Sequence, residues 1–390
     1  MKTVRFTGNP IIPKPAADPT VAQFGDSYYI YPTFGGIDEV GFGTWSSPDL
    51  CDFKSEGMIL RFSELGWAKK DAWAPDIIER NGKYYFYFSA DSAIGVAVSE
   101  SPTGPFVDPL GKPLIAFEED MSTIDPCVFI DDDGRTYLYW GATFYGKMFM
   151  RELCDDMISF KGEKQVVFDY SLEKDYHCEG SYVFKRGGLY YYLFSEYIWC
   201  DSPSLHFDHS YRVNYAVSER PEGPFTKTLS RVPILSTDMT LGYIGPGHNS
   251  VLNPPGTDDY YIVYHQHNGN ARFRMANIDR MTFSENGAIN TVRMTKEGVS
   301  AIPITAWLSH EVAGTATVGK EKRFTLGTRL DPDTVVSVTL VASGAVVYEG
   351  SFRDTLAFTP ETAGLYKVYA TLVDKDGVTH TTKALNLDAV

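Results

Sequence analysis

Short aromatic runs, each preceded by a polar turn, recur five times along the chain. Each run carries two or three tyrosines among other apolar residues, a composition that favours half-buried strands. The five turn-and-strand phrases are residues 25–31, 81–87, 133–139, 187–192 and 258–264. Their spacing of about 50–60 residues is close to that of propeller repeats, in which every repeat forms one blade of four short strands. The pattern therefore predicts an all-β fold with a five-bladed β-propeller.

The pattern and composition of the sequence change after about His310. The tyrosine-rich phrases end there, and short alternating runs separated by Asp, Pro and Gly turns continue to Val390. Regular short strands of this kind are typical of an immunoglobulin-like or fibronectin-like β-sandwich. We therefore predict two domains, a propeller over residues 1–310 and a sandwich over residues 311–390, and we assign no chemistry to the second domain.

Composition and charge narrow the classes of partner. The formal net charge of the 390 residues is −15, which opposes binding to nucleic acid or to an anionic membrane and is compatible with a neutral sugar. The chain lacks the long apolar run of a transmembrane helix and the apolar start of a signal peptide. We expect a cytoplasmic protein from the chain as written, or a secreted or periplasmic one if a leader has been removed. The sequence does not indicate an oligomeric state.

Three acidic residues stand immediately before predicted inner strands. Asp18 and Asp125 each precede a proline, and Glu179 precedes a glycine. The repeat assigns the three acids to equivalent positions. Because the inner strands of a propeller all start at one end of a central channel, we expect the three carboxyls to converge there. Cleavage of a glycosidic bond needs one protonated and one ionised carboxyl, and crowding with partial burial can separate their protonation states.

These phrases resemble glycoside hydrolase family 43. The resemblance covers residues 9–300 and rests on five motifs in order, at 18–21, 73–76, 124–126, 179–181 and 245–250. It implies a five-bladed propeller that hydrolyses arabinose- or xylose-containing glycans with inversion at the anomeric carbon. It also implies that Asp18 is the general base, that Glu179 is the general acid, and that Asp125 orients the acid and raises its pKa.

A substrate-binding shell is expected around the acids. Trp73 and Phe34 are predicted to form apolar walls for a sugar ring, and either Arg272 or Arg274 matches a sugar-contacting arginine of the family. His248 starts the fifth inner strand and should point into the channel, and in relatives the matching histidine lies beside a bound ion, often calcium. Since calcium prefers oxygen ligands, we expect His248 to be an indirect or partial metal ligand or to hydrogen-bond the acids. The chemistry itself requires no cofactor.

The expected substrate is an oligosaccharide or polysaccharide. We expect exo-action on a terminal α-L-arabinofuranosyl residue first and on a β-D-xylosyl residue second, whereas galactosyl, galactofuranosyl and endo-arabinan substrates stay open. The loop insertion at 199–211 favours a blocked, exo-acting pocket. The appended domain is shorter than the sandwich of family xylosidases, which leaves the sugar specificity open.

Alternative interpretations give the same residues other roles. A fructan- or sucrose-cleaving propeller would carry an arginine before the third-blade Asp, where this chain has Ile124. A lectin propeller would repeat one binding site in every blade, and a scaffold for protein partners would not need three inward acids. Cys178 as a nucleophile would need a histidine on the same face. His265 and His267 would need a third zinc ligand, so we expect core or channel roles for them.

Overall fold

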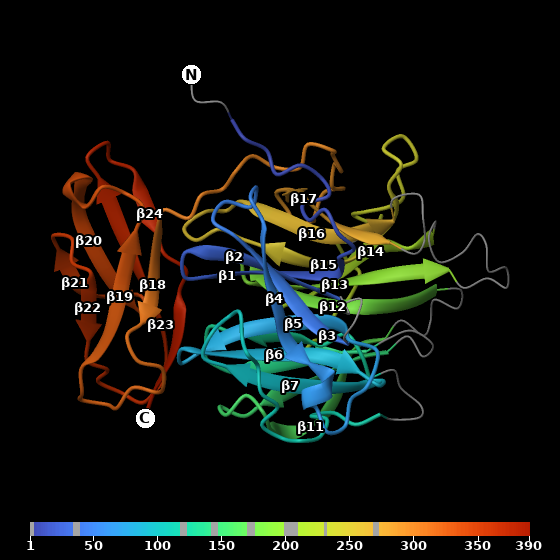
Figure 1. Ribbon diagram of the computed structural model, residues 1–390, viewed down its shortest axis with the longest axis horizontal. Coiled ribbons are helices and arrows are strands. Elements are labelled where there is room, and N and C mark those ends of the chain that lie inside the picture. The colour runs from blue at the N-terminus through green and yellow to red at the C-terminus, as the bar shows by residue number, and fades with distance from the viewer. Residues whose placement is uncertain are drawn as a thin grey trace.

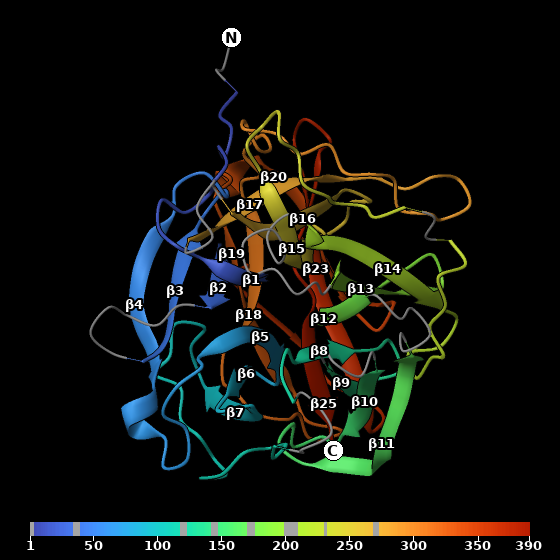
Figure 2. The ribbon, with the colours of Figure 1, turned by 90° about the vertical axis from the view of Figure 1, so that its right-hand side faces the viewer.

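Five small antiparallel sheets stand around a common axis (Figure 1, Figure 2). The computed structural model describes residues 4–33, 40–117, 123–141, 147–169, 176–198, 210–229, 232–267 and 273–390. The first strand of each sheet is innermost, and Figure 2 shows these five strands around the centre: β1, β5, β8, β12 and β15. The predicted all-β fold with a five-bladed propeller is confirmed.

The blades take their strands in chain order. They contain β1 (Ala17–Phe24), β2 (Ser27–Thr33), β3 (Gly41–Ser47) and β4 (Lys54–Arg61); β5 (Trp73–Arg80), β6 (Lys83–Ala90) and β7 (Ala93–Ser99); β8 (Cys127–Ile130), β9 (Thr136–Trp140), β10 (Lys147–Leu153) and β11 (Phe160–Asp169); β12 (Tyr176–Arg186), β13 (Leu189–Ile198) and β14 (Arg212–Ser218); and β15 (Ile244–Leu252), β16 (Tyr260–His267) and β17 (Arg274–Met281). Four strands per blade are predicted, but within the described ranges only the first and third blades have four. In the second and fourth blades, isolated bridges from Val98 to Val107 and from Val217 to Thr226 extend the outer edge instead.

The repeated tyrosines tie each blade to the next. Tyr31, Tyr87 and Tyr139 are buried at matching positions in β2, β6 and β9. A buried phenol needs a hydrogen-bond partner, and each of these hydroxyls donates to a main-chain carbonyl of the following blade. The acceptors are the carbonyl oxygens of Pro102 (2.8 Å), Met157 (2.6 Å) and Pro221 (2.8 Å). The residues whose repetition predicts the blades therefore also join them.

The start of the chain closes the ring of blades. The N–H of Ile11 donates to the carbonyl of Ala276 in β17, at 2.9 Å. The Asn9 side chain donates to the carbonyl of Ile278 and accepts from its N–H, at 3.0 and 2.9 Å. The first and last blades are thereby joined by hydrogen bonds between the two ends of the propeller sequence.

Polar side chains of the inner strands link the blades along the channel. The N–H of Val21 in β1 donates to the Ser250 hydroxyl of β15, at 3.0 Å. The N–H of Val128 in β8 donates to the Asp76 carboxyl of β5, at 2.7 Å. Burial, opposed by its hydrogen bonds, raises the pKa of Asp76 to about 7. The channel wall therefore contains a carboxyl that is neutral in mildly acidic solution.

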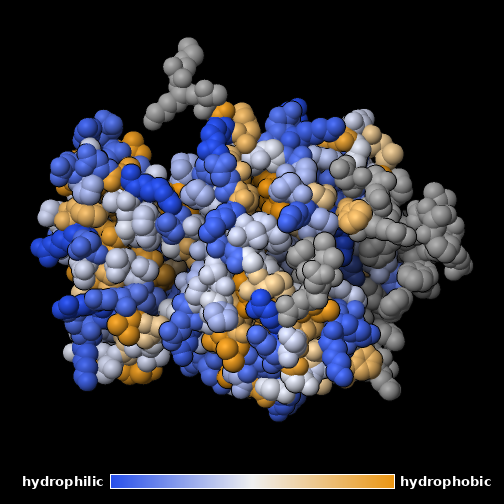
Figure 3. All heavy atoms as spheres, viewed as in Figure 1, coloured by the Kyte–Doolittle hydropathy of each residue, from blue (hydrophilic) through white to orange (hydrophobic). Residues whose placement is uncertain are grey.

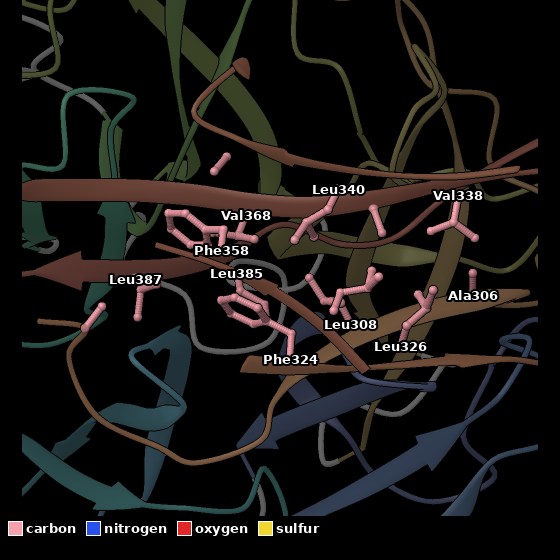
Figure 4. Close-up of a cluster of buried hydrophobic side chains, with 14 of the residues drawn as sticks. Ala306, Leu308, Phe324, Leu326, Val338, Leu340, Phe358, Val368, Leu385 and Leu387 are labelled. Atoms are coloured by element: carbon pink, nitrogen blue, oxygen red, sulfur yellow. The ribbon is translucent and has the colours of Figure 1, made fainter. Parts of the chain in front are cut away.

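The C-terminal residues form two further sheets around one apolar core (Figure 4). Their strands are β18 (Ala306–His310), β19 (Lys322–Thr328) and β22 (Thr355–Phe358) in one sheet, and β20 (Val335–Ala342), β21 (Ala345–Gly350), β23 (Gly364–Asp374), β24 (Thr379–Thr381) and β25 (Leu385–Ala389) in the other. β18 lies before the predicted boundary at His310, but it pairs with β19. The strands of the C-terminal sheets therefore begin at Ala306. The immunoglobulin-like class of this domain stays a prediction.

No helix in the described ranges is long and apolar enough to span a membrane.

Buried polar contacts fix the second domain against the propeller. Arg80 at the end of β5 pairs with Asp388 of β25 through two hydrogen bonds, of 2.7 and 2.6 Å, and the Arg80 side chain is only 3 % exposed. Glu79 lies 3.2 Å from Nε2 of His310 in β18. Both propeller residues lie at the end of the inner strand β5. The second domain therefore covers the end of the channel away from the starts of the inner strands.

We expect Asp76→Asn to change the pH dependence of stability. The folded-state pKa of Asp76 lies above its unfolded value, so its stabilising contribution is present below about pH 4 and is lost as the pH rises through 7. In urea unfolding, the wild type should lose about 2 kcal/mol relative to the variant between pH 5 and pH 8. Asp376→Asn, in an exposed turn, serves as the control. A constant difference between wild type and Asp76→Asn over this range would contradict the burial argument.

Candidate active site

The inner strands share an unusual backbone conformation where they enter the channel. At least one residue near each start has a positive φ, in the left-handed region that favours glycine. These residues are Asp18 (46°), Ala74 (44°), Asp125 (59°), Gly180 (71°) and His248 (39°). In four of the strands the pairing register with the second strand also shifts there, as at a β-bulge that re-aims side chains. The sequence repeat is therefore a repeat of backbone geometry.

Four of these residues donate their main-chain N–H to a side chain from the second strand of the preceding blade. The four pairs are Asp18 with Nδ1 of His265 (3.2 Å), Ala74 with Thr33 (2.7 Å), Asp125 with Ser89 (2.9 Å) and His248 with Ser195 (2.7 Å). The third blade has Gly141 two residues after its repeated tyrosine, where the first two blades have Thr33 and Ser89. The N–H of Gly180 binds the Asp125 carboxylate instead, at 2.9 Å. This hydrogen bond holds the Asp125 carboxylate against β12, the strand that carries Glu179.

The predicted equivalence of the three acids is wrong by one residue in the fourth blade. Asp18 and Asp125 have the positive φ, whereas the matching residue of the fourth blade is Gly180, directly after Glu179. A Cβ at Gly180 would lie 3.2 Å from Cγ of His248. Both the backbone conformation and this close approach therefore favour glycine. The acid of the fourth blade enters the site from the preceding position.

Asp18 is held as a carboxylate by its neighbours. Its Oδ1 lies 2.7 Å from Nη1 of Arg274, and its Oδ2 accepts the Thr33 hydroxyl at 2.6 Å. Burial favours the neutral form, but the positive charge of Arg274, followed by the contacts with His248 and His265, keeps the pKa of Asp18 well below its ordinary value. Asp18 is therefore ionised at neutral pH.

Glu179 is positioned by Tyr211, whose hydroxyl donates to Oε1 at 2.8 Å. The Tyr211 ring stacks with Tyr197 and with His265, at centroid distances of 5.7 and 5.6 Å. A Cβ at Gly247 would lie 1.9 Å from this ring, so a glycine there gives it room. Burial raises the pKa of Glu179 to about 7; the Tyr211 hydrogen bond opposes that rise and the charge of Asp18 adds to it.

Asp125 and His248 complete the buried cluster. Nδ1 of His248 lies 3.4 Å from Oδ1 of Asp18 and 3.8 Å from Oδ2 of Asp125. Burial, and then the charges of Glu179 and Asp18, raise the pKa of Asp125 well above its ordinary value, and burial lowers the pKa of His248. At neutral pH the site thus contains an ionised Asp18, a neutral imidazole, and an Asp125–Glu179 pair that holds at least one proton.

Of the residues predicted for the substrate-binding shell, the structure brings Arg274 into contact with this cluster. Trp73 lies at the start of β5 and is 41 % exposed, as a wall that faces a sugar would be. Arg274 reaches Asp18 from the start of β17. Phe34, Arg272 and residues 199–209 lie outside the described residues.

The His248 side chain lies beside the acids, and both roles expected for it stay predictions. Within the described ranges, no group of three or more His, Cys, Asp or Glu side chains is arranged to hold a metal ion. Calcium takes about 6–8 oxygen ligands, whereas the carboxylate oxygens near His248 already bond Arg274, Thr33 and the N–H of Gly180.

Two residues of the site carry no signal in the sequence. Thr33 ends a tyrosine-rich strand, and Tyr211 ends the loop insertion before β14. Neither belongs to a repeated phrase. Thr33 reaches Asp18 from the paired strand of the same blade, and Tyr211 reaches Glu179 from the segment just before β14 of the same blade. His265 is fully buried beside Asp18, which confirms the channel role expected for it. Cys178 is also buried, and burial raises the pKa of its thiol, which opposes a nucleophilic role.

Comparison with known families decides the identity of the chain. Residues 7–289 match the model of glycosyl hydrolases family 43. The chain belongs to this family. Family 43 enzymes hydrolyse O-glycosyl bonds with inversion, so the protein is an inverting glycosidase with a glycoside substrate.

Individual relatives agree on the fold and differ in the sugar. The chain is 38 % identical over 313 residues to a β-D-galactofuranosidase of Aspergillus niger, a match that covers 75 % of this chain and 86 % of the relative. The crystal structure of a thermostable family-43 glycoside hydrolase has a TM-score of 0.64 at 31 % identity and covers 75 % of this chain and 97 % of its own. An α-L-arabinofuranosidase from Clostridium thermocellum has a TM-score of 0.57 at 28 % identity, with coverages of 73 % and 95 %.

Tyr211→Phe should raise the pKa of Glu179, because the variant loses the hydrogen bond that stabilises the carboxylate. If the protonated form of Glu179 is the active one, the alkaline limb of kcat/KM should move up by roughly one pH unit. Tyr215→Phe is the matched control: Tyr215 is a buried tyrosine of β14, four residues after Tyr211, and its hydroxyl accepts the N–H of Ile289. An unchanged alkaline limb in Tyr211→Phe would refute the assignment of this titration to Glu179.

Proposed function

We propose that this glycosidase releases terminal furanosyl residues from glycans, with Asp18 as general base and Glu179 as general acid. The observation that carries the assignment is the difference in surroundings between two carboxyls of one buried cluster: Asp18 contacts Arg274, whereas Glu179 accepts a hydrogen bond from Tyr211. Arg274 favours the ionised form of Asp18, while burial favours a proton on Glu179 up to about pH 7. An inverting glycosidase needs one carboxyl of each kind.

The proposed reaction is a single displacement. Asp18 accepts a proton from a water molecule while the water oxygen bonds to the anomeric carbon. Glu179 gives its proton to the glycosidic oxygen as the bond from that oxygen to the anomeric carbon breaks. The products are an alcohol and a free sugar of opposite anomeric configuration. Asp18 is then protonated and Glu179 ionised, and proton exchange with solvent restores both.

The remaining residues of the cluster hold these two groups in place. Asp125 accepts the N–H of Gly180 and so fixes the backbone directly after Glu179; we assign it a positioning role. Arg274 keeps Asp18 ionised, and as its side chain is 29 % exposed it is also available to a sugar hydroxyl. Trp73 offers an exposed aromatic face for a sugar ring.

Galactofuranosyl and arabinofuranosyl groups are the two candidate substrates. The relative at 38 % identity is named a β-D-galactofuranosidase, and this match favours the galactofuranosyl group. An α-L-arabinofuranosyl group has the same ring configuration with an exocyclic arm shorter by one carbon, and the solved α-L-arabinofuranosidase favours it as the second candidate. Recognition of the longer arm would separate the two.

The test is a panel of 4-nitrophenyl glycosides: β-D-galactofuranoside, α-L-arabinofuranoside, β-D-xyloside and β-D-galactopyranoside. We expect the wild type to cleave the galactofuranoside or the arabinofuranoside, and Asp18→Ala to lose roughly 10²–10⁴-fold in kcat. Glu179→Ala should lose less on these activated substrates than on the matching methyl glycoside, because a good leaving group needs little protonation. Asp18→Ala should lose about equally on both.

Glu285→Ala, an exposed acid away from the cluster, controls for the loss of a negative charge. Activity on the xyloside alone would overturn the furanosidase proposal and leave the acid and base assignments standing. Full activity in Glu179→Ala on the methyl glycoside would overturn the assignment of the acid.

A further inference from the structure

A ring of residues from the second strands surrounds the entries of the inner strands. Five matching positions lie opposite the residue just before each left-handed step: Thr33, Ser89, Gly141, Ser195 and His265. All five are buried or half-buried. On the outer face shown in Figure 3, by contrast, apolar residues are scattered among polar ones rather than gathered into one patch. The contacts of this inner ring, rather than a surface patch, bear on the reaction.

Thr33 forms hydrogen bonds in two directions. Its hydroxyl donates to Oδ2 of Asp18 in its own blade, at 2.6 Å, and accepts the N–H of Ala74 from the next blade, at 2.7 Å. A hydroxyl has one hydrogen to donate, and a main-chain N–H can only be a donor. The Thr33 oxygen is therefore the acceptor towards Ala74, and its single hydrogen is left for Asp18.

The bond to Asp18 orients one particular oxygen of the base. Oδ1 of Asp18 lies within 2.7 Å of Nη1 of Arg274 and 3.1 Å of Nδ1 of His265. Among the described residues, Oδ2 accepts one hydrogen bond, from the Thr33 hydroxyl. A carboxylate oxygen has two acceptor positions, so Oδ2 keeps one for a water molecule. Thr33 thus sets the direction of the oxygen that is open to the attacking water.

The bond to Ala74 holds the entry of β5. Ala74 has a φ of 44°, a conformation that a non-glycine residue keeps only where its surroundings fix it. Trp73 directly precedes it and is 41 % exposed, and the register between β5 and β6 shifts just after Trp73. The acceptor that Thr33 provides therefore fixes the backbone from which the Trp73 ring projects.

We propose that Thr33 is a positioning residue that couples the general base to the sugar-binding wall, an inference that rests on the roles proposed above for Asp18 and Trp73. One hydroxyl orients the oxygen of the base and holds the strand entry that carries the wall. A sugar ring stacked on Trp73 is thereby aligned with the water that Asp18 activates. Loss of the hydroxyl lowers kcat through Asp18 and raises KM through Trp73.

The first test is Thr33→Val, which keeps the shape of the side chain and removes its hydroxyl. On the 4-nitrophenyl furanoside that the wild type cleaves, kcat should fall about tenfold or more, because a hydrogen bond to a charged group is lost. The loss should be equal on the matching methyl glycoside, as for Asp18→Ala. The alkaline limb of kcat/KM should stay in place, because Thr33 does not contact Glu179.

Two variants control for the change of side chain. Thr33→Ser keeps the hydroxyl and should restore kcat and KM to within about threefold of the wild type. Thr44→Val removes the hydroxyl of a buried threonine in β3 of the same blade, which donates to the carbonyl of Ile30 at 2.9 Å. It should keep the wild-type kinetics. If Thr33→Val does not fold, Thr33→Ala takes its place in the same comparison.

Double variants separate the two directions of the coupling. In an Asp18→Ala background, Thr33→Val should lower kcat no further, because its effect passes through Asp18. In a Trp73→Ala background, Thr33→Val should raise KM no further but should still lower kcat.

The inference is overturned if Thr33→Val keeps the wild-type kcat and KM, if Thr33→Ser loses as much as Thr33→Val, or if the loss in kcat persists in the Asp18→Ala background. Full activity of Asp18→Ala would overturn the proposed function itself. Loss of activity in Asp18→Ala together with wild-type kinetics in Thr33→Val would overturn the role of Thr33 alone.

Discussion

The site depends on one backbone constraint, the left-handed step at which each inner strand enters the channel. Non-glycine residues in this conformation are strained by about 1–3 kcal/mol and persist where the surrounding structure holds them. Here the support comes from the preceding blade, which accepts the N–H of Asp18, Ala74, Asp125 and His248 on a side chain of its second strand. The ring of blades thus fixes the backbone from which the catalytic side chains project.

The same packing gives the buried acids different pKa values. Asp18 lies next to Arg274, whose charge outweighs the effect of burial. Glu179 has no cation in hydrogen-bond contact; its only described side-chain hydrogen bond comes from the Tyr211 hydroxyl, so burial dominates and its pKa is about 7. Two carboxyls of one pocket therefore differ in charge because they face different blades. Environment, rather than residue type, separates an acid from a base.

Much of this could be predicted from the sequence, because the blades repeat. Most of the tyrosines that mark the blades are buried, and Tyr31, Tyr87 and Tyr139 each hydrogen-bond the next blade, so the spacing of the repeat follows from the architecture. Asp18, Asp125 and His248 could be found because they share one repeated position. Glu179 was placed one residue off, because the close approach of His248 to Gly180 is a contact between blades that no local pattern records.

Other parts of the site could not be predicted, for related reasons. Thr33 and Tyr211 lie in the same blades as Asp18 and Glu179, but their contacts with these acids come from tertiary structure that no repeated phrase records. The sugar specificity depends on residues such as Phe34 and Arg272, which the sequence singles out but which lie outside the described part of the chain.

The most direct test of the account is the configuration of the sugar first released. Proton NMR in the first minutes of cleavage of an aryl β-D-galactofuranoside, or of the α-L-arabinofuranoside if that is the substrate, would detect the product anomer before mutarotation. The account predicts inversion, with the α anomer appearing first from the β-galactofuranoside and the β anomer from the α-arabinofuranoside. First appearance of the anomer that matches the substrate would mean retention through a covalent intermediate and would contradict the roles given to Asp18 and Glu179.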